Sequence, residues 1–122
     1  ALNRILKKEA SKGNYVIAAG DFNQTFNNVD INEYKVRKGL WKPGIIDISD
    51  YDSSLNFVMD SATPTCRSLD RPLKGADKSK FQYYVIDGIV YSSNIEMFYC
   101  KTIDIGFRNS DHNPVVAEIK LK

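Results

Sequence analysis

Apolar and polar positions in the first twenty residues predict a helix followed by a strand. Within residues 2–10, leucine, isoleucine and alanine recur at helical spacing with lysine and arginine around them, so one face is apolar and the other basic. Gly13-Asn14 is a stop signal for this helix. Residues 15–19 are apolar without alternation, which indicates a strand covered on both faces. A helix that leads into a buried strand is typical of a layered α/β fold.

The middle of the chain carries mixed signals. Residues 24–52 contain turn-forming dipeptides and a single tryptophan, so we expect loop-rich, irregular structure with Trp41 as a hydrophobic anchor. At the end of this segment, we expect Asp52 or Ser53 to cap a short helix that runs through Met59.

The last part of the chain predicts an exposed loop and then strands. Residues 69–80 combine proline, glycine and basic side chains, a composition typical of a loop. Residues 81–91 are rich in aromatic and β-branched side chains, and a turn follows at residues 92–94. Along residues 95–103, mostly apolar side chains at odd-numbered positions alternate with a more varied set at even-numbered positions. Residues 115–122 alternate strictly, which predicts an outer antiparallel strand with one buried and one solvated face.

The composition is that of an ordinary globular protein. Of 122 residues, 43% are hydrophobic and 26% are charged, which fits one domain or a part of one. Seventeen basic and fifteen acidic residues leave a net charge of +2, too balanced to indicate a nucleic-acid-binding surface by charge alone. No apolar run approaches the roughly 20 residues of a transmembrane helix. Because the chain begins at Ala1, we expect that its natural start has been removed, so the sequence predicts no cellular compartment.

The cysteines and the histidine limit the kinds of site that the chain can build. Cys66 and Cys100 lie far apart, which fits neither a disulfide scaffold nor a zinc cluster. We expect two free or buried thiols, with one disulfide as the alternative. The single histidine argues against a catalytic zinc site, which usually draws on several His or Cys ligands.

Four short motifs carry the side chains that phosphoester hydrolysis can use. Three of them lie at or beside the end of an apolar strand-like run, where polar side chains can converge on one site. The motifs are Gly20-Asp21-Phe22-Asn23, Pro64-Thr65-Cys66-Arg67-Ser68, Val85-Ile86-Asp87-Gly88-Ile89 and Ser110-Asp111-His112-Asn113-Pro114.

The first motif offers a carboxylate and an amide. Asp21 can hold or deprotonate an attacking water, and Asn23 can donate a hydrogen bond to a phosphoryl oxygen. A spacing of two places both side chains on one side if the chain stays extended, and Gly20 allows a sharp turn before them. The alternative is an ordinary turn after a strand, because Asp and Asn both favour turns.

The later motifs combine carboxylates with the only histidine. Asp87 interrupts an apolar strand, where a buried carboxylate must be paired or hydrogen-bonded. We expect it either to pair with a structural partner such as an arginine or to fix the tautomer of His112. Asp111 offers an oxygen ligand of the kind that Mg²⁺ prefers. His112 could donate to a phosphate oxygen or move a proton, although a lone histidine is also common as a structural or surface residue.

In their order and spacing, the four motifs resemble the later half of the endonuclease/exonuclease/phosphatase superfamily, the deoxyribonuclease I-like hydrolases. The resemblance covers residues 15–121. It implies a two-sheet, four-layer α/β sandwich, with a mixed or antiparallel sheet and flanking helices, and phosphoester hydrolysis with Mg²⁺ or Mn²⁺. By the resemblance, Asp21 orients or activates water, Asn23 contacts phosphate and Asp87 is the partner of His112. Asp111 then lies at the metal and His112 at the scissile phosphate.

The resemblance also implies that residues 1–122 are the C-terminal half of such a domain. In the family, an asparagine, a principal metal-binding glutamate and further phosphate-binding residues precede the Asp-x-Asn element, and here only the first helix does. We therefore expect a parent hydrolase, a fragment that is inactive alone and binds Mg²⁺ weakly, and self-association through the apolar face that the other half would cover.

The substrate is left open by the sequence. Family members act on nucleic acids, nucleotides or phospholipid headgroups, and the net charge of +2 does not favour one of them. Basic side chains could contact a phosphate backbone, although such loops are more often simply solvated: Arg67, Arg71, Lys74, Lys78 and Lys80. A catalytically dead binding or scaffold domain of the same fold is the alternative to a hydrolase.

Overall fold

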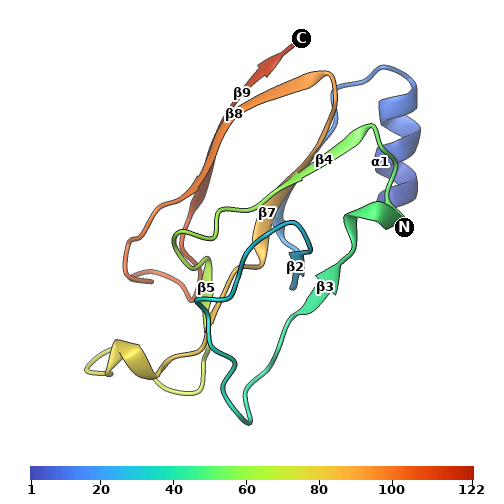
Figure 1. Ribbon diagram of the computed structural model, residues 1–122. Helices are drawn as coiled ribbons and strands as arrows, with labels where there is room; N and C mark the ends of the chain where they lie inside the picture. The colour runs from blue at the N-terminus through green and yellow to red at the C-terminus, as the bar shows by residue number, and fades with distance from the viewer.

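The computed structural model describes residues 1–122 as a mixed α/β structure made mostly of strands in small sheets, with one α-helix (Figure 1). The elements in chain order are α1 (Leu2–Ser11), β1 (Ile17–Asp21), β2 (Gln24–Phe26), β3 (Gly44–Ile46), the 3-10 helix η1 (Ile48–Asp50), β4 (Leu55–Val58), β5 (Cys66–Arg67), the 3-10 helix η2 (Lys78–Lys80), β6 (Tyr83–Tyr84), β7 (Asp87–Ser92), β8 (Ile95–Thr102) and β9 (Val115–Leu121).

The strands form four small sheets. The largest is antiparallel, with β7 between β1 and β4. β5 pairs with β6 and β8 with β9, both antiparallel, whereas β2 and β3 are parallel. In Figure 1, α1 and the long β8–β9 ribbon lie on opposite sides of β4 and β7.

The main core lies between α1 and the central sheet. Its buried side chains come from α1, β2, β3, β4, β7 and the segments beside them: Leu6, Val16, Phe26, Ile46, Leu55, Phe57, Met59, Val85 and Val90. A smaller cluster of Cys66, Tyr84 and Ile86 lies under β5 and β6. These three residues also line the cavity of the candidate site described below, so their packing connects that site to the rest of the fold.

The first helix is confirmed, whereas the prediction of a strand buried on both faces is wrong. The strand occupies Ile17–Asp21, and Ile17 is 49% exposed. β1 is an edge strand that pairs only with β7, so much of its surface has no neighbour. Val16, just before the strand, is the residue that enters the core.

The predicted helix from Asp52 or Ser53 to Met59 is also wrong, because residues 55–58 form β4. Leu55 and Phe57 are buried while Asn56 is exposed, a period of two that suits a strand on β7. Asp52 instead accepts hydrogen bonds from the N–H and hydroxyl of Ser54. So short an apolar run does not distinguish the period of a helix from that of a strand in the sequence.

The remaining strands agree in part with the sequence. Residues 24–52 are loop-rich as expected, but they also hold the β2–β3 pair. The single strand expected over residues 81–91 is two strands, because residues 83–84 pair with β5 and residues 87–92 pair with β1 and β4. β9 is confirmed as an antiparallel strand, and it pairs with β8. It alternates half-buried and exposed positions from Val115 to Lys120, so the face predicted to be buried is only half-buried.

The loop over residues 69–80 is mostly exposed, as predicted, and ends in η2. Cys66 and Cys100 are both free. None of the helices combines the length and the apolar character needed to cross a membrane.

Candidate active site

The register of β1 and β7 places two carboxylates beside each other. Asp21, the last residue of β1, lies directly opposite Asp87, the first residue of β7. Gly88 follows Asp87 because β4 passes very close there. A side chain at that position would meet Met59 Cγ at 2.5 Å and the carbonyl oxygen of Val58 at 2.8 Å. The close packing of β4 and β7 thus fixes the strand end that carries Asp87.

His112 lies between the two carboxylates. Its Nδ1 is 2.8 Å from Asp87 Oδ2, and its Nε2 is 3.8 Å from Asp21 Oδ2. Asp87 is only 15% exposed, so this hydrogen bond is shielded from water on the Asp87 side. The expected proximity of Asp87 and His112 is confirmed, and the alternative of an arginine partner for Asp87 does not apply, because its ion-pair partner is His112.

Backbone pairing holds the loop that carries His112. Cys66 and His112 form an isolated antiparallel bridge, and the N–H of Arg67 donates to the carbonyl of Asp111 at 2.9 Å. Asn113 is 3% exposed. Its Oδ1 accepts from two backbone N–H groups of the preceding loop, and its Nδ2 donates to the carbonyl of Pro64. The Ser-Asp-His-Asn-Pro motif therefore ends in a residue that anchors its own loop.

Asn23 lies at the site, although the chain does not stay extended after Asp21 as expected. The extended conformation ends at Asp21, and Asn23 has a φ of 53°, in the left-handed region. Asparagine tolerates this conformation better than most residues, and the Asn23 N–H donates to Asp21 Oδ1 at 2.7 Å. The chain thus turns after Asp21, while Gly20 is a member of β1 whose φ of 144° favours glycine.

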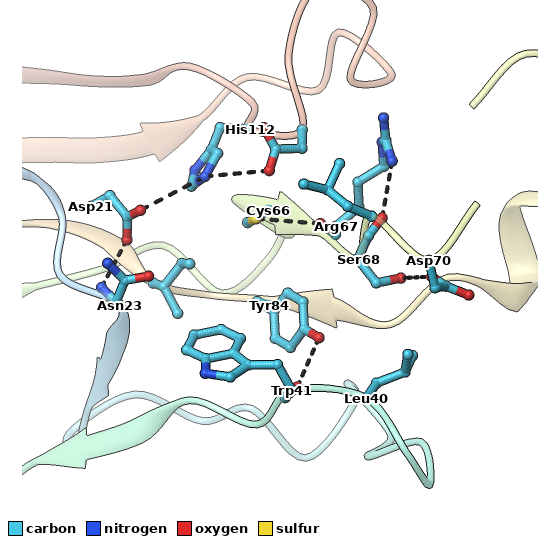
Figure 2. A pocket seen from close by; sticks show the side chains of 13 residues that line it. Asp21, Asn23, Leu40, Trp41, Cys66, Arg67, Ser68, Asp70, Tyr84 and His112 are labelled. Carbon is cyan, nitrogen blue, oxygen red and sulfur yellow. Dashed lines mark hydrogen bonds and ion pairs between the residues drawn. The ribbon is translucent and has the colours of Figure 1, made fainter. Parts of the chain in front are cut away.

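A cavity of about 360 Å³ opens beside His112 (Figure 2). Four of the predicted site residues line it: Asp21, Asn23, Asp111 and His112. Asp87 does not line the cavity but supports His112 from behind. Asp111 Oδ2 lies 4.0 Å from His112 Nε2, so this nitrogen is within about 4 Å of two carboxylates.

Cys66 was not predicted as a site residue, yet it lies in the same cavity. Burial, and then the carboxylates of Asp111, Asp87 and Asp21, raise the pKa of its thiol to about 12. The thiol is therefore protonated at neutral pH and unsuited to act as a nucleophile. The motif around Cys66 was visible in the sequence, but its contact with His112 depends on the pairing of distant segments.

Two aromatic residues line the cavity on the side across from His112 (Figure 2). Trp41 is 51% exposed and meets Tyr84 edge to face, with ring centroids 5.2 Å apart. The Tyr84 hydroxyl donates to the carbonyl of Trp41 at 2.8 Å. Trp41 packs against Tyr84, as expected for a hydrophobic anchor. About half of its surface is exposed at the cavity, so the anchor is only partly buried.

The basic residues divide into one buried side chain and an exposed set. Arg67 is only 9% exposed, and its guanidinium lies 5.1 Å from the ring centroid of Phe81, so its assignment to a solvated loop is wrong. The other four do not line the cavity: Arg71, Lys74, Lys78 and Lys80.

The cavity can bring a water, a phosphoryl group and a cation together. Carboxylates can hold water or a hard cation, the Asn23 amide can donate to a phosphoryl oxygen, and His112 Nε2 can exchange a proton with a ligand. Comparisons with protein-family models, curated proteins and solved structures find no match to this chain.

Proposed function

We propose that this chain carries the later part of a metal-dependent phosphoester hydrolase site of the deoxyribonuclease I-like type. The observation that carries the proposal is the orientation of His112. Its Nδ1 is engaged by the shielded Asp87, while its Nε2 belongs to a cavity that also contains Asp21, Asn23 and Asp111.

Each residue has a chemical part in this proposal. Asp87 accepts a hydrogen bond from Nδ1–H, so the neutral imidazole keeps its lone pair on Nε2. The same carboxylate stabilises the imidazolium once Nε2 gains a proton. His112 can then donate that proton to a phosphate oxygen or leaving group. Asp21 orients or deprotonates the attacking water, and Asn23 donates its amide N–H to a non-bridging oxygen.

The donor set suits Mg²⁺ or Mn²⁺. Asp111 and Asp21 are the carboxylates that would hold the ion, and both side chains are about one-third exposed. Mg²⁺ usually keeps several waters and binds through one or two carboxylates plus substrate. The bound ion would neutralise charge on the phosphoryl group. With only these two carboxylates, we expect the chain alone to bind Mg²⁺ weakly.

The proposal extends to the fold and to the substrate. The small sheets of this chain would form the C-terminal half of a two-sheet, four-layer α/β sandwich. The substrate is a phosphodiester or phosphomonoester from nucleic acid, nucleotide or phospholipid headgroup. The cavity offers it a polar wall around His112 and an aromatic wall at Trp41 and Tyr84.

A panel of phosphoesters with Mg²⁺ tests the proposal. Hydrolysis is measured for the 122-residue chain and for the longest natural form of the protein. The longest form should hydrolyse at least one class, whereas the 122-residue chain alone should be inactive. In the longest form, H112Q and D87N should each lower the rate by about 10²–10⁴-fold. D77N is the matched control, since Asp77 is exposed and its carboxylate accepts hydrogen bonds only from Ser79.

Two results would contradict the proposal. One is hydrolysis that H112Q leaves unchanged. The other is phosphoester binding without hydrolysis in every form of the protein, which would favour a catalytically dead binding or scaffold domain. Because Trp41 is the only tryptophan and lines the cavity, its fluorescence reports ligand binding separately from turnover.

A further inference from the structure

Cys66 adds a sulfur atom to the side of the cavity where Asp111 and His112 meet. One ligand atom from each of these three residues lies within 4.8 Å of the other two. In Figure 2 the sulfur of Cys66 points toward the space beside Asp21 and His112. Sulfur, imidazole nitrogen and carboxylate oxygen are the ligand types of protein zinc sites.

We propose that Cys66, Asp111 and His112 form a binding site for a soft divalent cation of the zinc and cadmium class, with Asp21 as a fourth ligand. Coordination replaces the proton of the Cys66 thiol, which is released to solvent. A hard cation such as Mg²⁺ takes oxygen ligands and gains nothing from sulfur. The thiol ligand therefore makes this site chemically different from the proposed Mg²⁺ site, although both use the carboxylates of Asp21 and Asp111.

The orientation of His112 is the first support for this site. Metal-binding histidines almost always engage their second ring nitrogen with a carboxylate, a carbonyl or water, which fixes the tautomer and the ring. Asp87 holds Nδ1 at 2.8 Å, so Nε2 is the nitrogen free to bind a metal. Asp87 thus serves the metal site as a positioning residue.

The rigidity of the backbone is the second support. β5 and the loop of Asp111 and His112 are joined by the Cys66–His112 bridge, by the hydrogen bond from Arg67 to Asp111, and by another at 2.8 Å from the N–H of Asn113 to the carbonyl of Thr65. The sulfur and nitrogen ligands therefore come from paired segments, and the fold holds them together before a metal binds.

The two distances from His112 to the carboxylates require only side-chain adjustment. Around a tetrahedral zinc ion, ligand atoms lie roughly 3.3–3.6 Å apart. His112 Nε2 lies 3.8 Å from Asp21 Oδ2 and 4.0 Å from Asp111 Oδ2. Both aspartates are partly exposed, so rotation of their carboxylates can shorten these distances without a change in the backbone.

A soft cation at this site would exclude phosphate from His112. It takes the lone pair of Nε2, the atom that the proposed hydrolysis uses for proton transfer. This consequence rests on the proposed function, whereas the metal binding itself does not. The metal test therefore reads out binding and not turnover, so either proposal can fail without the other.

Cadmium titration of the 122-residue chain tests the site. A bound thiolate gives Cd²⁺ a ligand-to-metal charge-transfer band in the ultraviolet, which carboxylate ligands do not. The band should saturate at one equivalent and persist in C100S, because Cys100 lies on β8, outside the cluster. It should be absent in C66S, with Cd²⁺ affinity at least about tenfold weaker, and D87N should weaken Cd²⁺ binding by about 10–100-fold.

The single histidine supplies a second readout. The Nε2 resonance of His112 should shift on Cd²⁺ binding, while Nδ1 keeps its proton toward Asp87. Loss of the band in C100S, its persistence in C66S, or Cd²⁺ binding without the band would each overturn the proposal. Circular dichroism of C66S and C100S checks that both variants are folded before their affinities are compared.

Discussion

Asp21 and Asp87 occupy directly opposed positions on antiparallel strands, and the imidazole of His112 lies between their carboxylates. Like charges at opposed positions normally destabilise a strand pair. Here the arrangement has a chemical use, because one carboxylate binds Nδ1 while the other faces Nε2. The two ring nitrogens of His112 are thereby given different environments.

The first prediction concerns the tautomer of His112. At a pH where the imidazole is neutral, its proton should reside on Nδ1, because Asp87 accepts a hydrogen bond from Nδ1–H. D87N should give a mixture of tautomers, since the Asn amide can either donate or accept. D21N should keep the Nδ1–H form. Long-range proton–nitrogen NMR measures this without ambiguity, because the chain has one histidine. A wild-type spectrum with the proton on Nε2 would exclude the assigned role of Asp87.

The second prediction concerns Thr65, which is fully buried under the site. Its Oγ1 accepts hydrogen bonds from the N–H of Ile86 at 3.0 Å and of Asp87 at 3.2 Å. T65V removes this acceptor and leaves two buried donors unpaired, so unfolding by urea should show a loss of about 1–3 kcal/mol.

The control for Thr65 is T65S, which keeps the hydroxyl and loses one methyl group, worth about 1 kcal/mol. T65V should also shift the Nδ1 proton resonance of His112, because Asp87 moves, whereas T65S should not. Equal shifts in both variants would mean that cavity formation, and not the hydroxyl, governs the position of Asp87.

The third prediction concerns the dependence of stability on pH. Because the pKa of Cys66 is about 12 in the folded chain against 9.0 for a free thiol, the folded state holds this proton longer than the unfolded state does. The stabilising contribution is complete below pH 9 and declines as pH rises toward 12. The stability of the wild type relative to C66S should therefore fall between about pH 9 and about pH 12. A difference that stays constant over this range would contradict the shift.

The pairing of Asp87 with His112 was accessible from the sequence, because a carboxylate inside an apolar strand requires a partner and the chain has only one histidine. The place of Cys66 was not accessible. An isolated backbone bridge between Cys66 and His112 brings the sulfur near this histidine, and the two residues are 46 positions apart in the sequence, a separation that no local pattern encodes. Trp41 likewise enters the site from a loop, where side-chain direction is set by its contact with Tyr84.

The helices and strands show the same division between what the local sequence predicts and what depends on pairing with distant segments. α1 and β9 have long, regular periods and were predicted, whereas β4 and the β2–β3 pair are only three or four residues long. Such short runs become strands because a neighbour supplies their hydrogen bonds. Asp52 was expected to begin a helix, but pairing of β4 with β7 decided the outcome.

The last prediction concerns the β8–β9 ribbon, which pairs with no other strand. A two-stranded ribbon is marginally stable in water without a cover. Phe98 is 53% exposed, and Val116 is also exposed. We expect a second copy of the chain to cover these side chains, so sedimentation velocity should show association that increases with concentration. F98K should weaken it, whereas V36K, at an exposed position outside the ribbon, should not. A monomer at every concentration, or equal effects of the two variants, would show that the ribbon is stable without a partner.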